Sequence, residues 1–129
     1  MAEKDVIRTD RAPGPFQGAP YNQAIRVGDL VFVAGQLGIS LETGTLAGAG
    51  VTEQTEQIMA NLGAILEAAG SGLDRLVKTT VFLMDLADFA AMNEVYAAHV
   101  GDRPPARSTV EISGLPSGAL VEIEAVGHV

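Results

Sequence analysis

One segment of the chain joins the end of a helix to the start of a strand: Arg103-Pro104-Pro105-Ala106-Arg107-Ser108-Thr109-Val110-Glu111-Ile112. The two prolines end the preceding helix because each lacks an amide donor, and they favour extended backbone. Side chains alternate on a strand, so Arg107, Thr109 and Glu111 are expected on one face. A guanidinium at the mouth of a strand suits a carboxylate ligand, although an isolated arginine more often forms a surface salt bridge.

The composition predicts a single domain over residues 1–129 with an aliphatic core. Hydrophobic residues make up 47% of the 129 and aromatic residues only 5%, and the chain has no cysteine. Residues 1–20 are polar and then proline-rich, which predicts an arm that lies on the body of the domain. With no disulfides, no membrane-spanning apolar run and no signal-peptide pattern, we expect a cytoplasmic protein without membrane contact.

The charge argues against nucleic acid as a partner. Eight Lys and Arg stand against 16 Asp and Glu, a formal net charge of −8. A phosphate backbone is repelled by such a field unless the cations are clustered, and they are spread along the chain. A small anionic ligand has to be bound locally by one well-placed cation, and Arg107 fits that need.

Hydrophobic periodicity predicts five strands and two helices. The strands are expected over 21–27, 30–37, 76–84, 107–112 and 119–126, with a loop over 38–50 and a central position for 76–84. The first helix is expected to begin at a Thr52 N-cap and end at Gly70, and the second to run from Asp88 to Gly101. The apolar stripe of the first helix consists of Ile58, Leu62, Ile65, Leu66 and Ala69.

This order predicts an α+β fold in which two helices cover one face of a mixed or antiparallel sheet. The other face of the sheet then has no element to cover it. An uncovered apolar surface of this kind is typical of a subunit interface, so we expect an oligomer.

The last two strands are expected to pair as a hairpin centred near Leu115-Pro116. In that register Thr109 lies roughly opposite Glu122, with Arg107 nearby on the same face. A carboxylate beside an arginine is usually a salt bridge, but a free Glu122 could hold a water and act as general base. Periodicity alone does not separate Glu122 from Glu124, and Glu111 is a third alternative.

The remaining polar residues have ordinary structural interpretations. Gln36 and Asn93 could donate or accept hydrogen bonds at a site, and Tyr21 opens a strand after a proline. His99 is expected at the surface near a helix C-terminus, where positive charge is favourable. The two histidines are far apart in sequence and predict no metal site.

Together these segments resemble the Rid (YjgF-type, reactive imine deaminase) family. The resemblance runs from about Arg8 to Val126. It is most specific where Pro105–Glu111 and Val121–Ala125 occur together with the Lys78-Thr79-Thr80-Val81-Phe82 strand. The matching motifs are Tyr21-Asn22-Gln23-Ala24, Gly35-Gln36, Val77–Leu83, Asp88–Tyr96, Pro105–Glu111 and Val121–Ala125.

The resemblance implies a chorismate-mutase-like fold, in which a six-stranded sheet is backed by two helices. It also implies a homotrimer with a barrel-like core and ligand clefts between neighbouring subunits. The implied activity is hydrolysis of 2-imino and 2-enamino acids, such as 2-iminobutanoate and 2-iminopropanoate, to 2-oxo acids and ammonia. No metal or organic cofactor is implied.

Carried over by position, the resemblance assigns roles to individual residues. Arg107 would bind the substrate carboxylate, backbone groups at Thr109 would help to seat it, and Glu122 would orient the attacking water. Tyr21 would close the cleft, and Asn93 matches a position near the site. The protein need only position the water, because an iminium carbon is already electrophilic.

The chain departs from the family pattern beside these positions. Ala34 stands where a serine is common, Ala19-Pro20-Tyr21-Asn22 replaces a more usual Gly-Pro-Tyr-Ser, and Leu37-Gly38 replaces an apolar residue followed by proline. These changes bear on the substrate range. Two alternatives stay open: a regulatory trimer that binds 2-oxo acids without turnover, and a ribonuclease, against which the charge argues.

Overall fold

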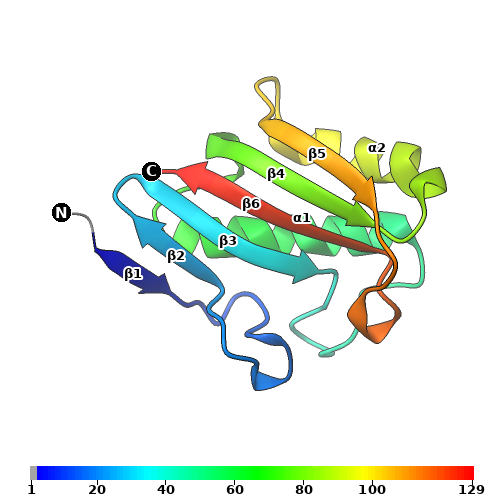
Figure 1. The fold of residues 1–129 in the computed structure, drawn as a ribbon, viewed down its shortest axis with the longest axis horizontal. Coiled ribbons are helices and arrows are strands. Elements are labelled where there is room, and N and C mark those ends of the chain that lie inside the picture. The colour runs from blue at the N-terminus through cyan, green and yellow to red at the C-terminus, as the bar shows by residue number, and fades with distance from the viewer. Residues whose placement is uncertain (1–2) are drawn as a thin grey trace.

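Residues 3–129 are described by a computed structural model, in which two helices lie behind one six-stranded sheet (Figure 1). The strands are β1 (Lys4–Ile7), β2 (Ala24–Val27), β3 (Leu30–Leu37), β4 (Leu76–Leu83), β5 (Ala106–Glu111) and β6 (Val121–His128), and the helices are α1 (Val51–Ala68) and α2 (Phe89–Val100). The strand order is β1-β2-β3-β6-β4-β5, and only β4 and β5 pair in parallel. The predicted α+β fold with a mixed six-stranded sheet backed by two helices is confirmed.

The core lies between α1 and the sheet, as the apolar stripe predicts. Ile58, Leu62 and Ile65 are fully buried in a cluster with the inward residues of β4 and β6. Gly70 has a φ of 86° and ends the helix, since this left-handed conformation is costly for other residues. The start of the helix differs from the prediction: Gly50, and not Thr52, is the N-cap, because Val51 already packs into the core.

The arm contributes a strand that the sequence analysis missed. Lys4–Ile7 pairs antiparallel with β2, with Val6 opposite Ile25. Three of its four residues are exposed. An edge strand is held by backbone hydrogen bonds on one side and needs no buried face, so it lacks the alternating pattern by which strands are recognised.

The predicted hairpin between the last two strands is wrong. β6 lies between β3 and β4, and β5 pairs with the far side of β4, at the edge of the sheet. Thr109 therefore pairs with Val81, which in turn pairs with Ile123 and not with Glu122. The reason is that β4, α2 and β5 form a crossover unit, which places two parallel strands side by side. The predicted central position of β4 is confirmed, since it has a neighbour on each side.

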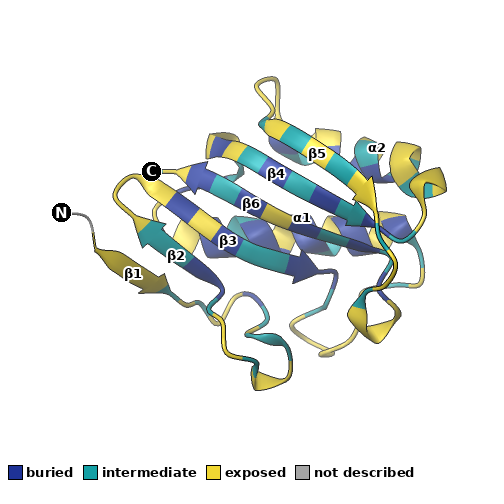
Figure 2. Ribbon diagram, in the orientation of Figure 1, coloured by how far each residue is buried: buried dark blue, intermediate teal, exposed yellow. Residues whose placement is uncertain are grey.

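One face of the sheet is uncovered in this chain. The helices lie behind the sheet in the view of Figure 2, and exposed residues alternate with more buried ones along the first half of β3 and along β5. Phe32 on β3 is 46% exposed and Val110 on β5 is 43% exposed. Neither helix in residues 3–129 has the combination of length and apolar character that crossing a bilayer requires.

Buried polar side chains of α1 hold the loop that follows β3 and the segment that enters β6. The Gln54 side chain accepts a hydrogen bond from the Leu120 amide (2.9 Å) and donates one to the Gly48 carbonyl (3.0 Å). Asn61 donates to the carbonyls of Leu37 and Ile39. These contacts join the end of β3, its following loop and the start of β6 to one helix.

Replacing Gln54 tests how much the loops depend on α1. We expect Gln54→Leu to lower the free energy of unfolding by about 2–4 kcal/mol, because two partly buried backbone groups lose their partners at about 1–2 kcal/mol each. Urea denaturation at one protein concentration measures the change. The exposed Thr52→Leu variant on the same helix is the control, and equal effects of the two substitutions would contradict the role given to Gln54.

Candidate functional site

A cleft of about 690 Å³ opens at the end of β3, beside the start of β6. Its walls come from the arm (residues 13–17), from residues 35–37 at the end of β3, and from residues 44–46 of the following loop. The other lining residues are Tyr21, Gln23, Ile39, Pro116, Ser117 and Glu122. Glu122 is the only ionisable group among the lining residues other than the phenol of Tyr21.

Glu122 reaches the cleft because of the alternation along β6. Val121 and Ile123 on either side of it point into the core and are fully buried, so the Glu122 side chain points to the uncovered face. Partial burial raises the pKa of the Glu122 carboxyl, and the nearby charge of Glu124 raises it further. No side chain within residues 3–129 forms an ion pair with Glu122.

Gly35 makes room for this carboxylate. A Cβ at Gly35 would lie 2.9 Å from Cδ of Glu122 and 3.0 Å from its Oε2. The pairing of β3 with β6 shifts register between Val33 and Gln36, so Gly35 lies in an irregular part of the strand. The Gly35-Gln36 motif therefore has a steric basis: any larger residue would displace the carboxylate.

Arg107 lies elsewhere, on the helix-covered face of the sheet. Its Cζ is 4.8 Å from the centroid of the Tyr96 ring and 5.5 Å from that of Phe89, both on α2. Among residues 3–129 the paired charged side chains are Arg11 with Glu67, and His99 Nε2 lies 2.7 Å from Oε2 of Glu56. The Arg107 guanidinium thus has aromatic contacts but no carboxylate partner in the described chain.

The expected proximity of Arg107 and Glu122 is wrong within one chain. Arg107 pairs with Thr79 on β4, which pairs with Ala125, whereas Glu122 pairs with Phe82. The two residues are therefore offset along the sheet, are separated by a strand, and point to opposite faces. The cause is the insertion of β4 between β5 and β6.

Of the other predicted site residues, Tyr21 lies at the cleft, and Thr109 and Asn93 lie on the side of the sheet where Arg107 is found. Tyr21 lines the cleft with Glu122, and its hydroxyl accepts a hydrogen bond from the Phe16 amide (2.5 Å). Thr109 follows Arg107 on the same face of β5. Asn93 lies between Phe89 and Tyr96 on one stripe of α2, and its buried Oδ1 has no hydrogen-bond partner in the described residues.

Gln23 is a residue whose role the sequence analysis missed. It is 4% exposed, and its side chain accepts from the Thr9 amide and donates toward the carbonyls of Thr9, Ala12 and Pro13. These contacts hold the arm where it forms a wall of the cleft. Gln23 belongs to a motif of the family resemblance, but nothing in the local pattern shows that its side chain is buried.

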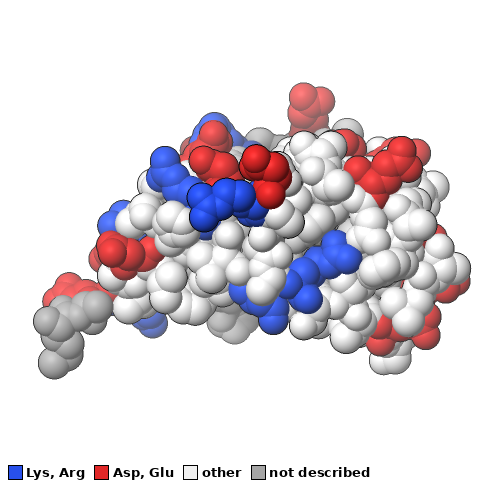
Figure 3. Space-filling view, turned by 90° about the horizontal axis from the view of Figure 1, so that it is seen from above, with Lys and Arg blue, Asp and Glu red and all other residues white. Residues whose placement is uncertain are grey.

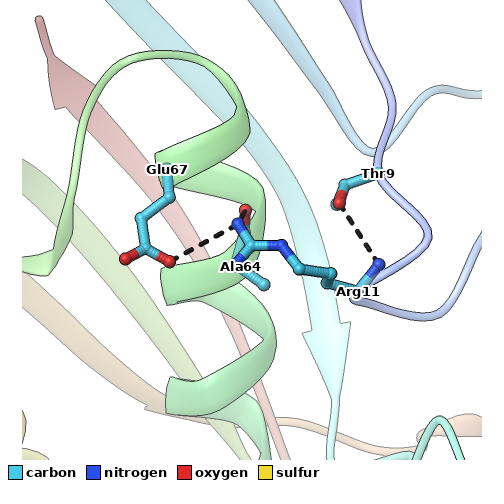
Figure 4. Close-up of polar contacts among 4 residues, drawn as sticks. All are labelled: Thr9, Arg11, Ala64 and Glu67. Carbon is cyan, nitrogen blue, oxygen red and sulfur yellow. Dashed lines mark hydrogen bonds and ion pairs between the residues drawn. The ribbon is translucent and has the colours of Figure 1, made fainter.

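Arg11 ties the same arm to α1 (Figure 4). Its Nη2 is 3.4 Å from the Ala64 carbonyl and 3.5 Å from Oε2 of Glu67, and its amide donates to the Thr9 hydroxyl at 3.2 Å. Both charged groups are largely exposed, so the pair is a weak tether compared with the buried contacts of Gln23.

Two residues of the cleft have left-handed backbone conformations. Gln17 has a φ of 52° and Ser117 a φ of 60°, and each is followed by a glycine that also has positive φ. Such conformations cost free energy for residues with a side chain and are enriched at functional sites. The glycines at 18 and 118 are the visible signal of these turns in the sequence.

Nothing in this arrangement forms an evident metal site. Within residues 3–129, His, Cys, Asp and Glu side chains do not gather in groups of three or more that could hold an ion. The chemistry available at the cleft is that of one partly buried carboxylate, with hydrogen-bonding groups of Gln36 and Tyr21 nearby.

Comparison with known proteins identifies relatives along nearly the whole chain. Residues 11–129 match the family described as Endoribonuclease L-PSP. A RutC family protein of Pyrococcus abyssi is 50% identical over 125 residues, 97% of each chain. The human 2-iminobutanoate/2-iminopropanoate deaminase is 41% identical over 121 residues, 94% of this chain and 87% of that protein. The crystal structure of Escherichia coli TdcF with bound serine superposes with a TM-score of 0.88 at 38% identity, covering 97% of this chain and 98% of that one.

The raised pKa of Glu122 predicts a pH-dependent cost to stability. The folded protein holds this proton more tightly than the unfolded chain does, so stability falls as pH rises from the unfolded pKa through the higher folded value. We expect Glu122→Gln to have a higher free energy of unfolding than the wild type at about pH 7, and the difference to disappear near about pH 3, where both side chains are neutral.

Urea denaturation across this pH range measures the difference. Glu42→Gln, in an exposed loop position, is the control and is expected to follow the wild type. A stability difference between Glu122→Gln and the wild type that does not change with pH would refute the proposed desolvation of Glu122.

Proposed function

Because this chain belongs to the YjgF/RidA family, we propose that it hydrolyses 2-imino and 2-enamino acids, such as 2-iminobutanoate and 2-iminopropanoate, to 2-oxo acids and ammonia. Two observations support the proposal: the Arg107 guanidinium on the edge strand has no carboxylate partner among residues 3–129, and Glu122 is a partly buried carboxylate that lines a cleft. The human relative named as such a deaminase is 41% identical over most of this chain.

Arg107 would bind the substrate carboxylate. A guanidinium presents parallel N–H donors that match the two oxygens of a carboxylate, and these charge-assisted bonds are among the strongest in proteins. Arg107 has no carboxylate partner within residues 3–129, so its donors are available. Thr109 on the same face of β5 would help to seat the ligand through its backbone, and Asn93, whose buried Oδ1 has no partner within residues 3–129, would lie close to the site on the neighbouring helix.

Glu122 would position the attacking water. Water adds to the carbon of the C=N bond while the carboxylate accepts one of its protons and passes it to nitrogen, which gives a carbinolamine. The proton of the new hydroxyl is then transferred to nitrogen through the same carboxylate, so that the C–N bond breaks, ammonia leaves and C=O forms. An enamine substrate first takes up a proton at carbon to become the imine. A raised pKa suits this role, because a carboxylate is a better base as its pKa approaches neutrality.

The two groups can act on one substrate if they come from different subunits. They point to opposite faces of the sheet in one chain, but Arg107 lies on an edge strand and the cleft opens at another part of the sheet. We therefore assign the active site to the boundary between two copies of a homotrimer. The Arg107 of one copy would meet the Glu122 and Tyr21 of the next, and the uncovered sheet faces would form the shared core.

Binding without turnover is the second candidate function. The solved structure of TdcF contains serine, an amino acid with a carboxylate, and a 2-oxo-acid sensor would use the same Arg107 contact. The absence of turnover in the assay below, with binding retained, would favour the sensor.

A ribonuclease, the activity in the family's description, fits the charge less well. The net charge is −8, and on the face shown in Figure 3 the described Lys and Arg side chains form separate groups, some with Asp and Glu beside them and one among uncharged residues. Nucleic acid binding usually needs a continuous basic surface.

Kinetics of site variants test the deaminase proposal. An amino-acid oxidase supplies the imine, and semicarbazide trapping measures how fast the protein removes it. We expect Arg107→Ala to lower kcat/KM by about 100-fold, the value of a charge-assisted contact, and Glu122→Gln to lower kcat by about 100-fold or more.

The controls separate the open alternatives. Arg103→Ala, in the exposed segment before β5, and Glu124→Gln and Glu111→Gln are expected to stay within about threefold of the wild type. The enzyme proposal fails if the wild-type protein does not deplete the imine at any concentration, and the assignment of Glu122 fails if Glu124→Gln has the larger effect.

Mixing two inactive variants tests the shared site. If each site takes Arg107 from one subunit and Glu122 from the next, then trimers reassembled from equal amounts of Arg107→Ala and Glu122→Gln contain about one intact site in four. We expect about a quarter of wild-type activity after mixing and reassembly. Activity that stays at the level of the separate variants, in mixtures shown by mass spectrometry to contain both, would refute a site shared between Arg107 of one subunit and Glu122 of the next.

A further inference from the structure

The side chain of Arg107 is contacted by two aromatic rings of α2 and has no ion-pair partner among residues 3–129. Its guanidinium lies over the Tyr96 ring and near the Phe89 ring, at 4.8 Å and 5.5 Å from their centroids. An arginine on an edge strand without other contacts would occupy many rotamers, and ordering it on ligand binding would weaken affinity. The aromatic contacts order the side chain before a ligand arrives.

Tyr96 is itself held in place. The residue is 5% exposed, and its hydroxyl lies 2.6 Å from the hydroxyl of Thr79. Thr79 is 1% exposed and is the residue of β4 that pairs with Arg107 in the parallel ladder. One strand thus fixes both the backbone of Arg107 and the ring over which its guanidinium lies.

We propose that Tyr96 is the positioning residue of the Arg107 carboxylate clamp, and that the Thr79 hydroxyl sets the orientation of its ring. The flat face of the ring restricts the plane of the guanidinium, and the N–H donors at its edge stay free for a ligand. This inference rests on the proposed role of Arg107 in binding the substrate carboxylate.

The charge state of Tyr96 agrees with this role. Burial raises the pKa of the phenol, although the Thr79 hydrogen bond and the Arg107 charge act in the opposite direction. Tyr96 therefore stays neutral at physiological pH. A neutral ring attracts the guanidinium through its face without occupying the donors, whereas a phenolate would compete with the substrate carboxylate for them.

Phe89 makes the weaker contact. It is 42% exposed at the start of α2 and lies farther from the guanidinium than Tyr96 does. Solvent weakens cation–π attraction at exposed rings. The main restraint on Arg107 is therefore the buried ring of Tyr96.

The test compares ligand affinity with turnover. The clamp binds the carboxylate in both the ground state and the transition state, so loss of positioning raises KM and leaves kcat nearly unchanged. We expect Tyr96→Leu to raise KM for the imine and Kd for 2-oxobutanoate, measured by calorimetry, about tenfold, with kcat within about threefold.

Conservative variants separate positioning from general stability. Tyr96→Phe keeps the ring face and loses only the bond to Thr79, so Kd is expected to rise about twofold to threefold, with no further rise when Thr79→Val is added. Val95→Ala, at a buried neighbour on α2, is the matched control. It is expected to lower thermal stability while leaving KM unchanged.

A measurement on the wild-type protein tests the inference even if the Tyr96→Leu variant does not fold. An aromatic ring at this distance shifts the NMR signals of the arginine side chain, so the Arg107 δ protons are expected upfield of those of the exposed Arg103. Unshifted Arg107 signals would overturn the inference.

Two outcomes distinguish this inference from the proposed function. If Tyr96→Leu binds 2-oxobutanoate as the wild type does while Arg107→Ala does not, then the clamp stands and the positioning role of Tyr96 fails. If Arg107→Ala binds 2-oxobutanoate as tightly as the wild type, the clamp itself fails, and with it the reason for positioning Arg107.

Discussion

The alternation of side chains along β6 is the constraint on which the rest of the molecule depends. Val121, Ile123 and Ala125 point to the helices and complete the core, which forces Glu122 and Glu124 onto the uncovered face. β6 can serve as the central strand only because its inward residues are apolar along its length. The same two-residue period that stabilises the sheet therefore directs the Glu122 carboxylate to the cleft. A register shift of one residue would turn the glutamates of β6 toward the core and its apolar residues toward the uncovered face.

The cleft is built from segments that α1 and Gln23 hold in place. Gln54 and Asn61 fix the loop after β3, and Gln23 fixes the arm on the opposite side. The left-handed turns at Gln17 and Ser117 stand at the same cleft. The free-energy cost of these left-handed conformations is tolerated because the surrounding buried hydrogen bonds fix the backbone conformation of the segments.

Because the protein is acidic, the binding of an anionic ligand would depend strongly on a single cation, Arg107. A net charge of −8 repels small anions at long range, so an anionic ligand has to be recognised by short-range contacts. An arginine held over a buried tyrosine would meet this need, because the ring restrains the guanidinium while its donors have no carboxylate partner among residues 3–129. A salt bridge to a neighbouring carboxylate would have ordered the side chain equally well, but it would have occupied the donors.

Local pattern determined much of the architecture. The stripe of α1, the stop at Gly70, the second helix from Asp88 and the strand at 76–84 follow from periods and turn residues within about a dozen positions. The family resemblance added the total of six strands, without locating the sixth, and the roles expected of the candidate site residues. These features depend on neighbours in the chain, and so a sequence read alone can show them.

Only the tertiary structure decided which elements meet. A strand's pattern sets which face is buried but not which strand lies beside it, so the pairing of β5 with β4 and the edge position of Lys4–Ile7 were not predicted. For the same reason Arg107 and Glu122 could be named as candidates, yet their positions on opposite faces of the sheet could not. The aromatic support of Arg107 and the burial of Gln23 arise from contacts between distant segments, which no local period encodes.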